Sequence, residues 1–308
     1  MSDIWAITAY FNPVGYERRL ANYHVFRSRL SVPLVTVELA YGEEFELGEG
    51  DADVLVQLRS TDILWQKERL LNIALTALPL TCRKVVWVDC DVVFGSDDWA
   101  QRASRRLDDI ALLQPFSRVH YLTSDAGPNG FRPANAEMTR SSLAAMTASG
   151  LPAGNWLTEL RDRRHPPGVG LAWAARRDVL DRNGLYDACV VGGGDRAIVA
   201  AASGSFSELM DSQNMNLSQR LAFLNWARPF HTETGSVDGY VDGNLFHLWH
   251  GKSGDRSYGE RHAGLSAFEF DPSVDIAVDE NGALRWNSDK PALHEYVRAY
   301  FLSRNEDG

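Results

Sequence analysis

One short segment constrains the fold more than any other part of the sequence. Residues 84–88 read Lys-Val-Val-Trp-Val, an apolar run that buries both faces of a strand. Strands of this kind belong to parallel sheets that helices cover on both sides. Around this run, apolar strand-like segments alternate with helical patterns over the first 115 residues, which predicts βαβ units. We therefore expect an α/β protein with a central, mostly parallel sheet flanked by helices, and a looser second half.

The apolar runs and periodicities place the expected elements along the chain. Proline or glycine marks the end of several of them. The expected strands are 5–10, 34–39, 53–58, 84–88 and 168–173, and the expected helices are 17–30, 64–78, 136–148, 176–183, 198–202, 217–227 and 291–304. Residues 124–133 are predicted to form a loop, and 235–261 show no clear periodicity.

Charge and cysteine content exclude several classes of protein. The chain has 308 residues, 31 Lys and Arg against 41 Asp and Glu, and a net charge of −10. This balance disfavours binding to a nucleic-acid backbone as the main activity. Three cysteines (Cys82, Cys90, Cys189) make no disulfide framework and fit a reducing compartment. There is no apolar stretch of about 18 residues and no signal-peptide pattern, so a cytoplasmic protein is expected.

An Asp-x-Asp motif follows the apolar strand directly. Asp89 and Asp91 flank Cys90 at the carboxyl end of that strand, where open α/β sheets bind ligands. Two carboxylates there can hold a hard divalent cation. An ordinary acidic turn is the alternative. An EF-hand loop is excluded, because its twelfth position would be Ala100.

A histidine segment late in the chain is the second candidate metal site. It reads His247-Leu-Trp-His250-Gly and is followed by Lys252 and Arg256. Mixed imidazole and carboxylate ligands suit Mn²⁺ better than Mg²⁺. Basic side chains next to them can hold a diphosphate. Two structural histidines in a core segment are the alternative.

Two further segments carry polar groups in suggestive patterns. Gly192-Gly-Gly-Asp195-Arg196 brings one carboxylate to a glycine loop, and Asp195 there can serve as a general base. A flexible loop with Asp195 as a helix N-cap is the alternative. In the helix before the Asp-x-Asp strand, Arg69 and Asn72 share a face, which can equally be a solvated surface.

Taken in this order, these segments resemble the GT-A class of nucleotide-sugar glycosyltransferases. They are most similar to the β-1,4-galactosyltransferase-like group and to related bacterial polysaccharide transferases. The resemblance rests on 7–12, 67–72, 88–91, 170–184 followed by 192–195, and 247–256. Two positions depart from the family's Gly-Gly-Glu-Asp block: Gly194 replaces its Glu, and Arg196 replaces the acid after the base. The acceptor specificity of the family therefore does not carry over.

The resemblance implies a Rossmann-like GT-A fold and a sugar transfer from a UDP-sugar to a hydroxyl acceptor with inversion. It assigns a divalent metal, Mn²⁺ before Mg²⁺, to Asp91 and His250 with help from Asp89 or His247. It assigns Asp195 as the base. The implied donor-binding residues are Thr8, Tyr10, Arg69, Asn72, Asp89, Lys252 and Arg256, and the implied acceptor residues are Trp173, Gly193, Gly194 and Arg196.

The same resemblance divides the chain by function. Residues 1–115 would bind the nucleotide-sugar, residues 116–270 would bind the acceptor and complete the metal site, and 271–308 would form a C-terminal extension and helix. The expected acceptor is a glycan, a lipid-linked glycan or a small molecule. Trp156 and Trp249 are further candidate sugar platforms, and 129–132 a candidate acceptor-side loop.

Three alternatives remain open at this point. The segment 85–93 also fits the nucleophile motif of haloacid-dehalogenase-like phosphohydrolases, although position 199, where that family has a second acid, is Val199. A non-catalytic sugar-binding protein is the second alternative. The third is a transferase that modifies nucleic-acid bases, for which the arginines of 102–106 and 161–164 leave room.

Overall fold

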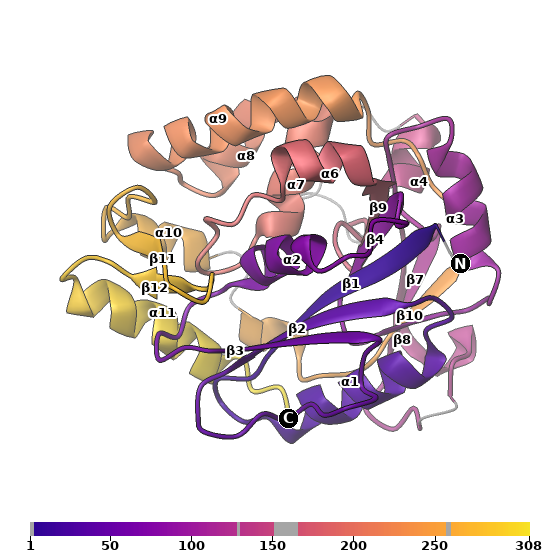
Figure 1. The fold of residues 1–308 in the computed structure, drawn as a ribbon, viewed down its shortest axis with the longest axis horizontal. Coiled ribbons are helices and arrows are strands. Elements are labelled where there is room, and N and C mark those ends of the chain that lie inside the picture. The colour runs from indigo at the N-terminus through magenta and orange to yellow at the C-terminus, as the bar shows by residue number, and fades with distance from the viewer. Residues whose placement is uncertain (1–2, 128–129, 151–165, 257–259) are drawn as a thin grey trace.

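The structure is a computed structural model, and it describes residues 3–127, 130–150, 166–256 and 260–308. Its centre is a six-stranded sheet in the order β3-β2-β1-β4-β9-β6 (Figure 1). The strands are β1 (Ile4–Phe11), β2 (Leu34–Ala40), β3 (Val54–Arg59), β4 (Lys84–Val88), β6 (Leu112–Leu113) and β9 (Ala172–Arg176). β1 pairs in parallel with β2 and β4, β2 pairs in parallel with β3, and β9 runs antiparallel to β4 and β6. The mostly parallel sheet and the α/β class are therefore confirmed.

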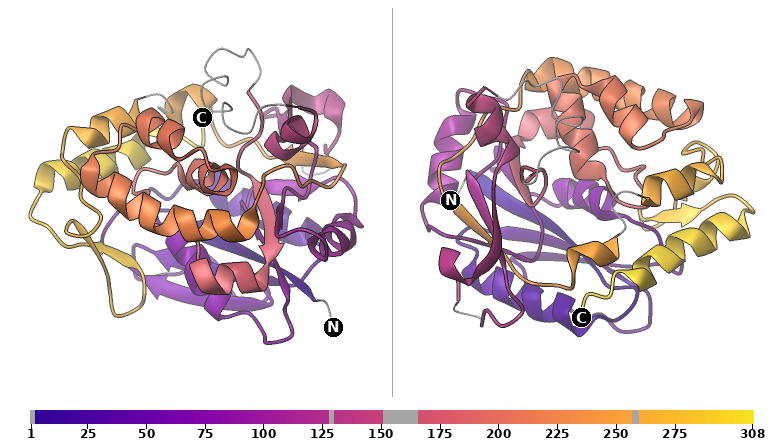
Figure 2. Two further views of the ribbon diagram at one scale, coloured as in Figure 1. Left: turned by 90° about the horizontal axis from the view of Figure 1, so that it is seen from above. Right: turned by 180° about the vertical axis from the view of Figure 1, so that it is seen from behind.

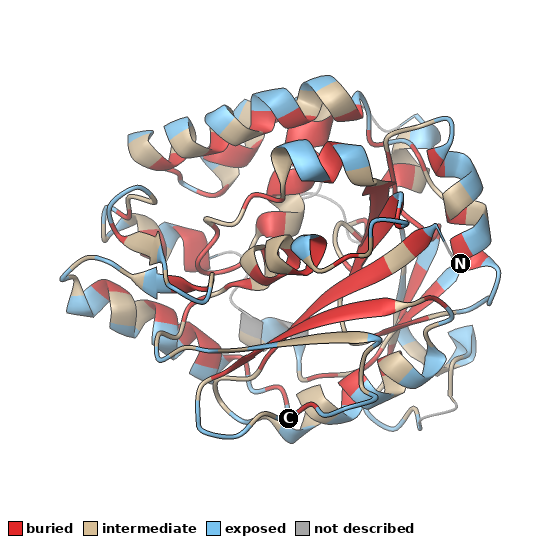
Figure 3. Ribbon diagram, viewed as in Figure 1, coloured by how far each residue is buried: buried red, intermediate tan, exposed pale blue. Residues whose placement is uncertain are grey.

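Alternating side chains of β1 pack into different cores. Ile7, Ala9 and Phe11 belong to a cluster that includes α2 (Lys67–Thr76), whereas Ala6 and Tyr10 pack with α1 (Glu17–Arg29). This is the period of two that a strand imposes. The two helices thus cover opposite faces of the sheet, and Figure 3 shows the strands buried between them.

Two of the other helices pack on the sheet, and the rest pack mainly on one another. α3 (Trp99–Leu107) packs against β9 and β6, and α6 (Arg177–Asn183) packs against β9 and α9. α7 (Gly194–Ser203) contacts α8 (Phe206–Ser212) and α9 (Leu217–Thr234), and α10 (Arg261–Ser266) contacts α11 (Pro291–Ser303). Figure 2 shows this helical layer from above and from behind. The expected helices at 176–183, 198–202, 217–227 and 291–304 are confirmed, while α3, α8 and α10 were not predicted.

A second sheet was not predicted from the sequence. Its order is β5-β10-β7-β8, with β5 (Val92–Phe94), β7 (Arg118–Leu122), β8 (Ala136–Ser141) and β10 (Asn244–His247). The helix expected at 136–148 is wrong over its first half, because those residues pair with β7 as β8. The helix is the shorter α4 (Leu143–Ala148), and the Ser142 hydroxyl caps it by accepting from the Ala145 amide. The strand expected at 168–173 begins later, at Ala172.

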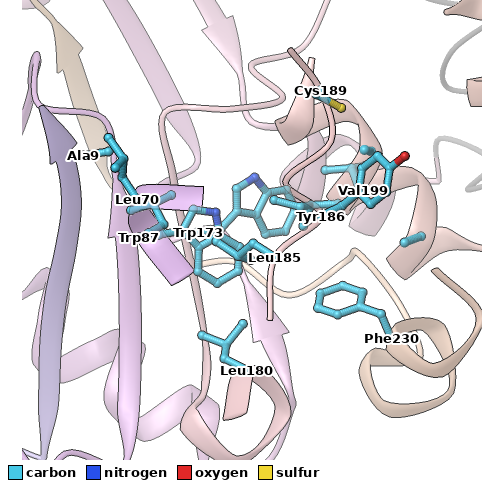
Figure 4. Close-up of a cluster of buried hydrophobic side chains, with 14 of the residues drawn as sticks. Ala9, Leu70, Trp87, Trp173, Leu180, Leu185, Tyr186, Cys189, Val199 and Phe230 are labelled. Carbon is cyan, nitrogen blue, oxygen red and sulfur yellow. The ribbon is translucent and has the colours of Figure 1, made fainter. Parts of the chain in front are cut away.

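The chain after residue 270 belongs to the same core as the sheet. It forms the hairpin β11 (Ile276–Val278) and β12 (Leu284–Trp286) and then α11. Phe301 of α11 packs edge-on against Phe11 of β1 and stacks on Trp65. One cluster therefore joins the central sheet to α2, α7, α9 and α11, and Figure 4 shows its centre around Trp87 and Trp173. Among the described residues, no helix is long and apolar enough to cross a membrane.

Candidate functional site

The polar side chains of interest gather where β4 ends. β4 is fully buried, and the chain leaves it at Asp89, whose amide donates to the Leu171 carbonyl at 2.7 Å. Asp91 follows, and β5 then begins at Val92. The Asp-x-Asp motif thus lies at the carboxyl end of a parallel strand, as expected for a ligand site in such a sheet.

Pairing between β5 and β10 brings Asp91 to the late histidines. Val92 lies opposite His247, and the Leu248 amide donates to the Asp91 carbonyl at 2.8 Å. His250 Nε2 lies 3.2 Å from Asp91 Oδ2 and 2.9 Å from His247 Nε2. One ligand atom from each of the three residues falls within 4.8 Å of the others. Two imidazole nitrogens and a carboxylate oxygen that converge in this way fit a transition-metal ion such as Mn²⁺.

Lys67 joins the Asp-x-Asp motif to Asp195. Its ammonium, at the start of α2, lies 2.8 Å from both carboxylate oxygens of Asp195 and 3.0 Å from Asp89 Oδ1. Asp195 in turn lies in the first turn of α7. Asp89 is not one of the three converging metal ligands; its carboxylate is held by Lys67 instead.

Burial and mutual repulsion perturb the acids around Lys67. Burial raises the pKa of Asp89 to about 6, against the attraction of Lys67 and with repulsion from Asp195 and Asp91. Burial likewise raises the pKa of Glu68 to about 7. The pKa of Lys67 is held well above its usual value by Asp195, Asp89 and Glu68, which outweigh the opposing effect of burial. Several carboxyl groups around one ammonium make a site that favours an additional cation.

The backbone approaches Asp195 closely at Gly170. A Cβ atom on Gly170 would lie 2.5 Å from Asp195 Oδ2, so no other residue fits there without moving the carboxylate. Gly194 is under a similar constraint, because a Cβ atom there would overlap the Glu68 carboxyl group. The glycines on both sides of Asp195 are therefore explained by close packing.

Two residues expected to bind the nucleobase and the ribose of the donor lie inside the fold. Thr8 has no exposed surface, and its hydroxyl donates to the Val88 carbonyl at 2.7 Å. The side chain thus links β1 to the end of β4, and its predicted contact with the nucleotide would require this buried hydroxyl to become exposed. Tyr10 is 1% exposed, and its hydroxyl donates to Glu46, which also accepts from Asn12.

Arg69 and Asn72 hold other segments of the chain. Arg69 Nε donates to the Gly282 carbonyl at 2.5 Å, in the β11–β12 turn. The Asn72 amide group donates to the Leu185 carbonyl and accepts from the Leu185 amide. Both side chains therefore join segments of the fold in this structure. Their role in donor binding stays a prediction. Lys252 is exposed, and the side chain of Arg256 lies outside the description.

The residues predicted to bind the acceptor substrate lie in two different places. Trp173 has no exposed surface, and its indole N–H donates to the Val169 carbonyl, so its predicted contact with a sugar would require the ring to leave the core. Gly193 (φ +103°), Gly194 and Arg196 lie at the start of α7 beside Asp195. Trp249 is half-buried, with Arg18 over its ring. Trp156, Asn129 and residues 161–164 fall outside the described ranges.

Sequence reasoning did not assign roles to Lys67, Glu68 or His262. Lys67 carried a usable signal, because it opens the helix that leads into the Asp-x-Asp strand. Glu68 is the neighbour of Lys67 and is 2% exposed, yet nothing in its spacing marks it as buried. His262 gave no signal, because only the tertiary structure brings it to the glycine loop.

Comparison with solved structures finds glycosyltransferases among those similar to this chain. No protein-family model and no curated protein matches the chain. One similar structure is glucosyl-3-phosphoglycerate synthase from Mycobacterium tuberculosis with Mn²⁺, UDP-glucose and glycerol 3-phosphate (14% identity, 93% of this chain and 87% of that one, TM-score 0.43). Another is the mannosyltransferase PcManGT from Pyrobaculum calidifontis with GDP-Man and Mn²⁺ (14% identity, 97% and 69%, TM-score 0.42). A third is S. aureus TarS 1–349 with UDP-GlcNAc (12% identity, 66% and 53%, TM-score 0.37). At these TM-scores the likeness assigns no activity to this chain.

Proposed function

We propose that this protein is a metal-dependent glycosyltransferase that moves a sugar from a UDP-sugar to an acceptor hydroxyl with inversion. The observation that carries the proposal is the convergence of Asp91, His247 and His250 at the carboxyl end of β4, beside the Lys67-linked pair Asp89 and Asp195. A divalent ion held by these three residues would lie at the carboxyl ends of the strands, where parallel sheets bind their ligands. The acidic surroundings favour that cation.

The residues present divide the chemistry between them. Asp91, His247 and His250 would hold the metal ion, which when bound stabilises negative charge on a leaving diphosphate. Asp195 accepts the proton of the acceptor hydroxyl. Lys67 donates to both oxygens of Asp195 in this structure, so one of these contacts must loosen when the proton arrives. Lys67 thereby orients the carboxylate toward the attacking group.

The first test is a calorimetric titration with UDP, with and without Mn²⁺, using UMP, GDP and ADP as controls. We expect UDP to bind only when the metal is present. Asp91→Asn keeps the shape of the side chain but removes the charge at the metal, so we expect this variant to lose the Mn²⁺-dependent binding. Asp289→Asn, an exposed site with the same charge change, is the matched control.

The alternatives predict different results. Absence of binding to every nucleoside diphosphate, together with Mg²⁺-dependent hydrolysis of a phosphomonoester, would replace the proposal by a phosphohydrolase with Asp89 as nucleophile. UDP-sugar binding without turnover would indicate a sugar-binding protein. Transfer to a modified nucleic-acid base would keep the transferase and change the acceptor.

The proposal also assigns a function to each part of the chain and a cellular compartment to the protein. Residues 1–115 would bind the donor, 116–270 would bind the acceptor and complete the metal site, and 271–308 would form an extension. We place the protein in the cytoplasm because its three cysteines are free thiols. Membership of the β-1,4-galactosyltransferase-like group remains part of this proposal.

A further inference from the structure

The start of α7 is built like a site for an anion. Gly192 and Gly193 have φ angles of +79° and +103°, and α7 begins at Gly194. The first amides of a helix have no partner within the helix and carry its positive partial charge. A helix start alone does not define a site, so the surrounding side chains decide the question.

His262 is aimed at this helix start from α10. It is 7% exposed, and a Cβ atom on Gly193 would lie 3.0 Å from its Nε2. Among the residues that the structure describes, this Nε2 atom is buried and has no hydrogen-bond partner. A buried polar atom without a partner is costly. In the tautomer that carries its hydrogen on Nε2, a ligand that accepts this hydrogen bond removes the cost.

Two arginines belong to the helices that meet at this turn. Arg196 lies in the first turn of α7, and the Arg261 guanidinium lies 3.3 Å from the position of a Cβ on Gly192. Burial lowers the pKa of His262 to about 3, with Arg261 and Arg196 adding to the effect, so both guanidinium groups act on the imidazole. Tyr300 accepts a hydrogen bond from Arg261 Nη1 at 2.5 Å and fixes its position.

Two acids lie at this turn. Asp195 belongs to it, and its carboxylate is paired with the Lys67 ammonium. Glu68 approaches Gly194 from α2, 4.0 Å from the Lys67 ammonium. Burial raises the pKa of Glu68 to about 7, so it opposes an incoming anion less than an exposed carboxylate would.

We infer that the acceptor carries an anionic group, a phosphate or a carboxylate, which binds between Arg196, Arg261 and His262 at the start of α7. The inference rests on the proposed function and adds the substrate class. Gly193 and Asp195 both lie at the start of α7, so an acceptor held there by its anionic group would have its other groups near the proposed base. The anionic group thus positions the acceptor, and the base receives its proton.

The experiment uses the full chain and two kinds of probe. Inorganic sulfate is titrated calorimetrically in EDTA and again with saturating UDP and Mn²⁺, which fill the donor site. Glucose 6-phosphate, glucuronate and glucose are then compared, because they distinguish phosphate, carboxylate and neutral acceptors. The variants are Arg196→Gln and His262→Gln. Arg228→Gln, an exposed charge loss on α9, is the control.

We expect sulfate to bind under both conditions, and one anionic sugar to bind more tightly than glucose. Each site variant should weaken sulfate binding by about tenfold, as expected for the loss of one hydrogen bond to a charged group, while UDP binding and thermal unfolding stay unchanged. The control should bind sulfate like the wild type.

Metal-dependent UDP binding together with sulfate affinities that the variants leave unchanged would overturn the anion site and leave the transferase intact. Sulfate binding that the variants weaken, without any UDP binding, would support the anion site and reject the transferase. If glucose binds as tightly as both charged sugars in the presence of UDP, the anionic acceptor is wrong.

Discussion

At the scale of single residues, the positions of the Asp89 and Asp195 carboxylates depend on Lys67. Its ammonium bridges Asp89, after β4, and Asp195, at the start of α7. These two acids come from distant parts of the chain and would repel each other without the lysine. The orientation of Asp195 depends on Lys67 on one side and on the absence of a side chain at Gly170 on the other.

Gly170→Ala tests this orientation. The added methyl group would lie 2.5 Å from Asp195 Oδ2, so the carboxylate must turn away. We expect kcat for sugar transfer to fall at least about tenfold, because a misplaced base costs catalysis of that order or more. The Kd of UDP with Mn²⁺ should not change. Gly243→Ala adds a methyl group where no atom lies within 4 Å, and should leave both quantities as they are.

Glu68→Gln tests the burial of this carboxyl group. The folded pKa of about 7 lies above the ordinary value of 4.5, so the folded protein binds the proton more tightly than the unfolded chain. Ionisation therefore lowers the wild-type free energy of unfolding as pH rises from about 4.5 to about 7. Glutamine has no such ionisation. We expect urea unfolding in EDTA to show the variant gaining stability relative to wild type between pH 5 and pH 7.5; a constant difference would contradict the shifted pKa.

At the scale of elements, the end of the chain fastens α1 to the rest of the molecule. Glu306 is 1% exposed and binds Arg19 of α1 at 2.9 Å and Arg304 at 2.6 Å. The Asp307 carboxylate accepts from the amides of Glu17 and Arg18, which open α1. Figure 1 shows the C-terminus beside this helix. α1 has no side-chain cap of its own at Tyr16, so Asp307 supplies the cap from a distant part of the sequence.

Glu306→Gln should therefore destabilise the protein. The substitution leaves two arginines facing a neutral group at a buried position, and losing one partner of a buried ion pair typically costs about 3–5 kcal/mol. Chemical denaturation at neutral pH measures the loss. Glu295→Gln breaks an exposed pair with Arg298 on α11 and should change little. Equal effects of the two substitutions would show that Glu306 is not held as described.

At the scale of the whole molecule, one apolar cluster joins the proposed donor and acceptor parts. These parts are therefore not expected to unfold independently. Ile7 and Trp87 of the central sheet, Ala197 of α7 and Val297 of α11 belong to one buried cluster. No part of this core can open without exposing apolar surface in the others.

Unfolding should consequently follow one transition. We expect far-UV circular dichroism, which follows all elements, and tryptophan fluorescence to give the same denaturation midpoint. Separate midpoints would show that the proposed division into donor and acceptor parts is also a division in stability.

Elements with a clear local pattern of apolar residues could be predicted from the sequence. Elements and side-chain positions that depend on contacts with distant segments could not. The apolar run 84–88 predicts a buried strand, and the structure forms β4 there. The Asp-x-Asp motif follows at the carboxyl end of this strand, as predicted. By contrast, β8 has half-exposed residues and no apolar periodicity, so only its pairing with β7 defines it. Thr8 and Trp173 look like ligand-binding residues in sequence, yet their polar atoms are bound to backbone carbonyls in the core.

The cap that Asp307 places on α1 affects how the protein is made. A ribosome synthesises Glu17 290 residues before the aspartate that receives its amide hydrogen. Until residue 307 has left the exit tunnel, the first turn of α1 lacks this partner and the Arg19 side chain lacks Glu306. The strands of the sheet can pair during translation, but the edge of the molecule formed by α1 closes only after the last turn of α11 has emerged. Nascent chains halted before residue 304 should therefore be cut by proteases near the start of α1.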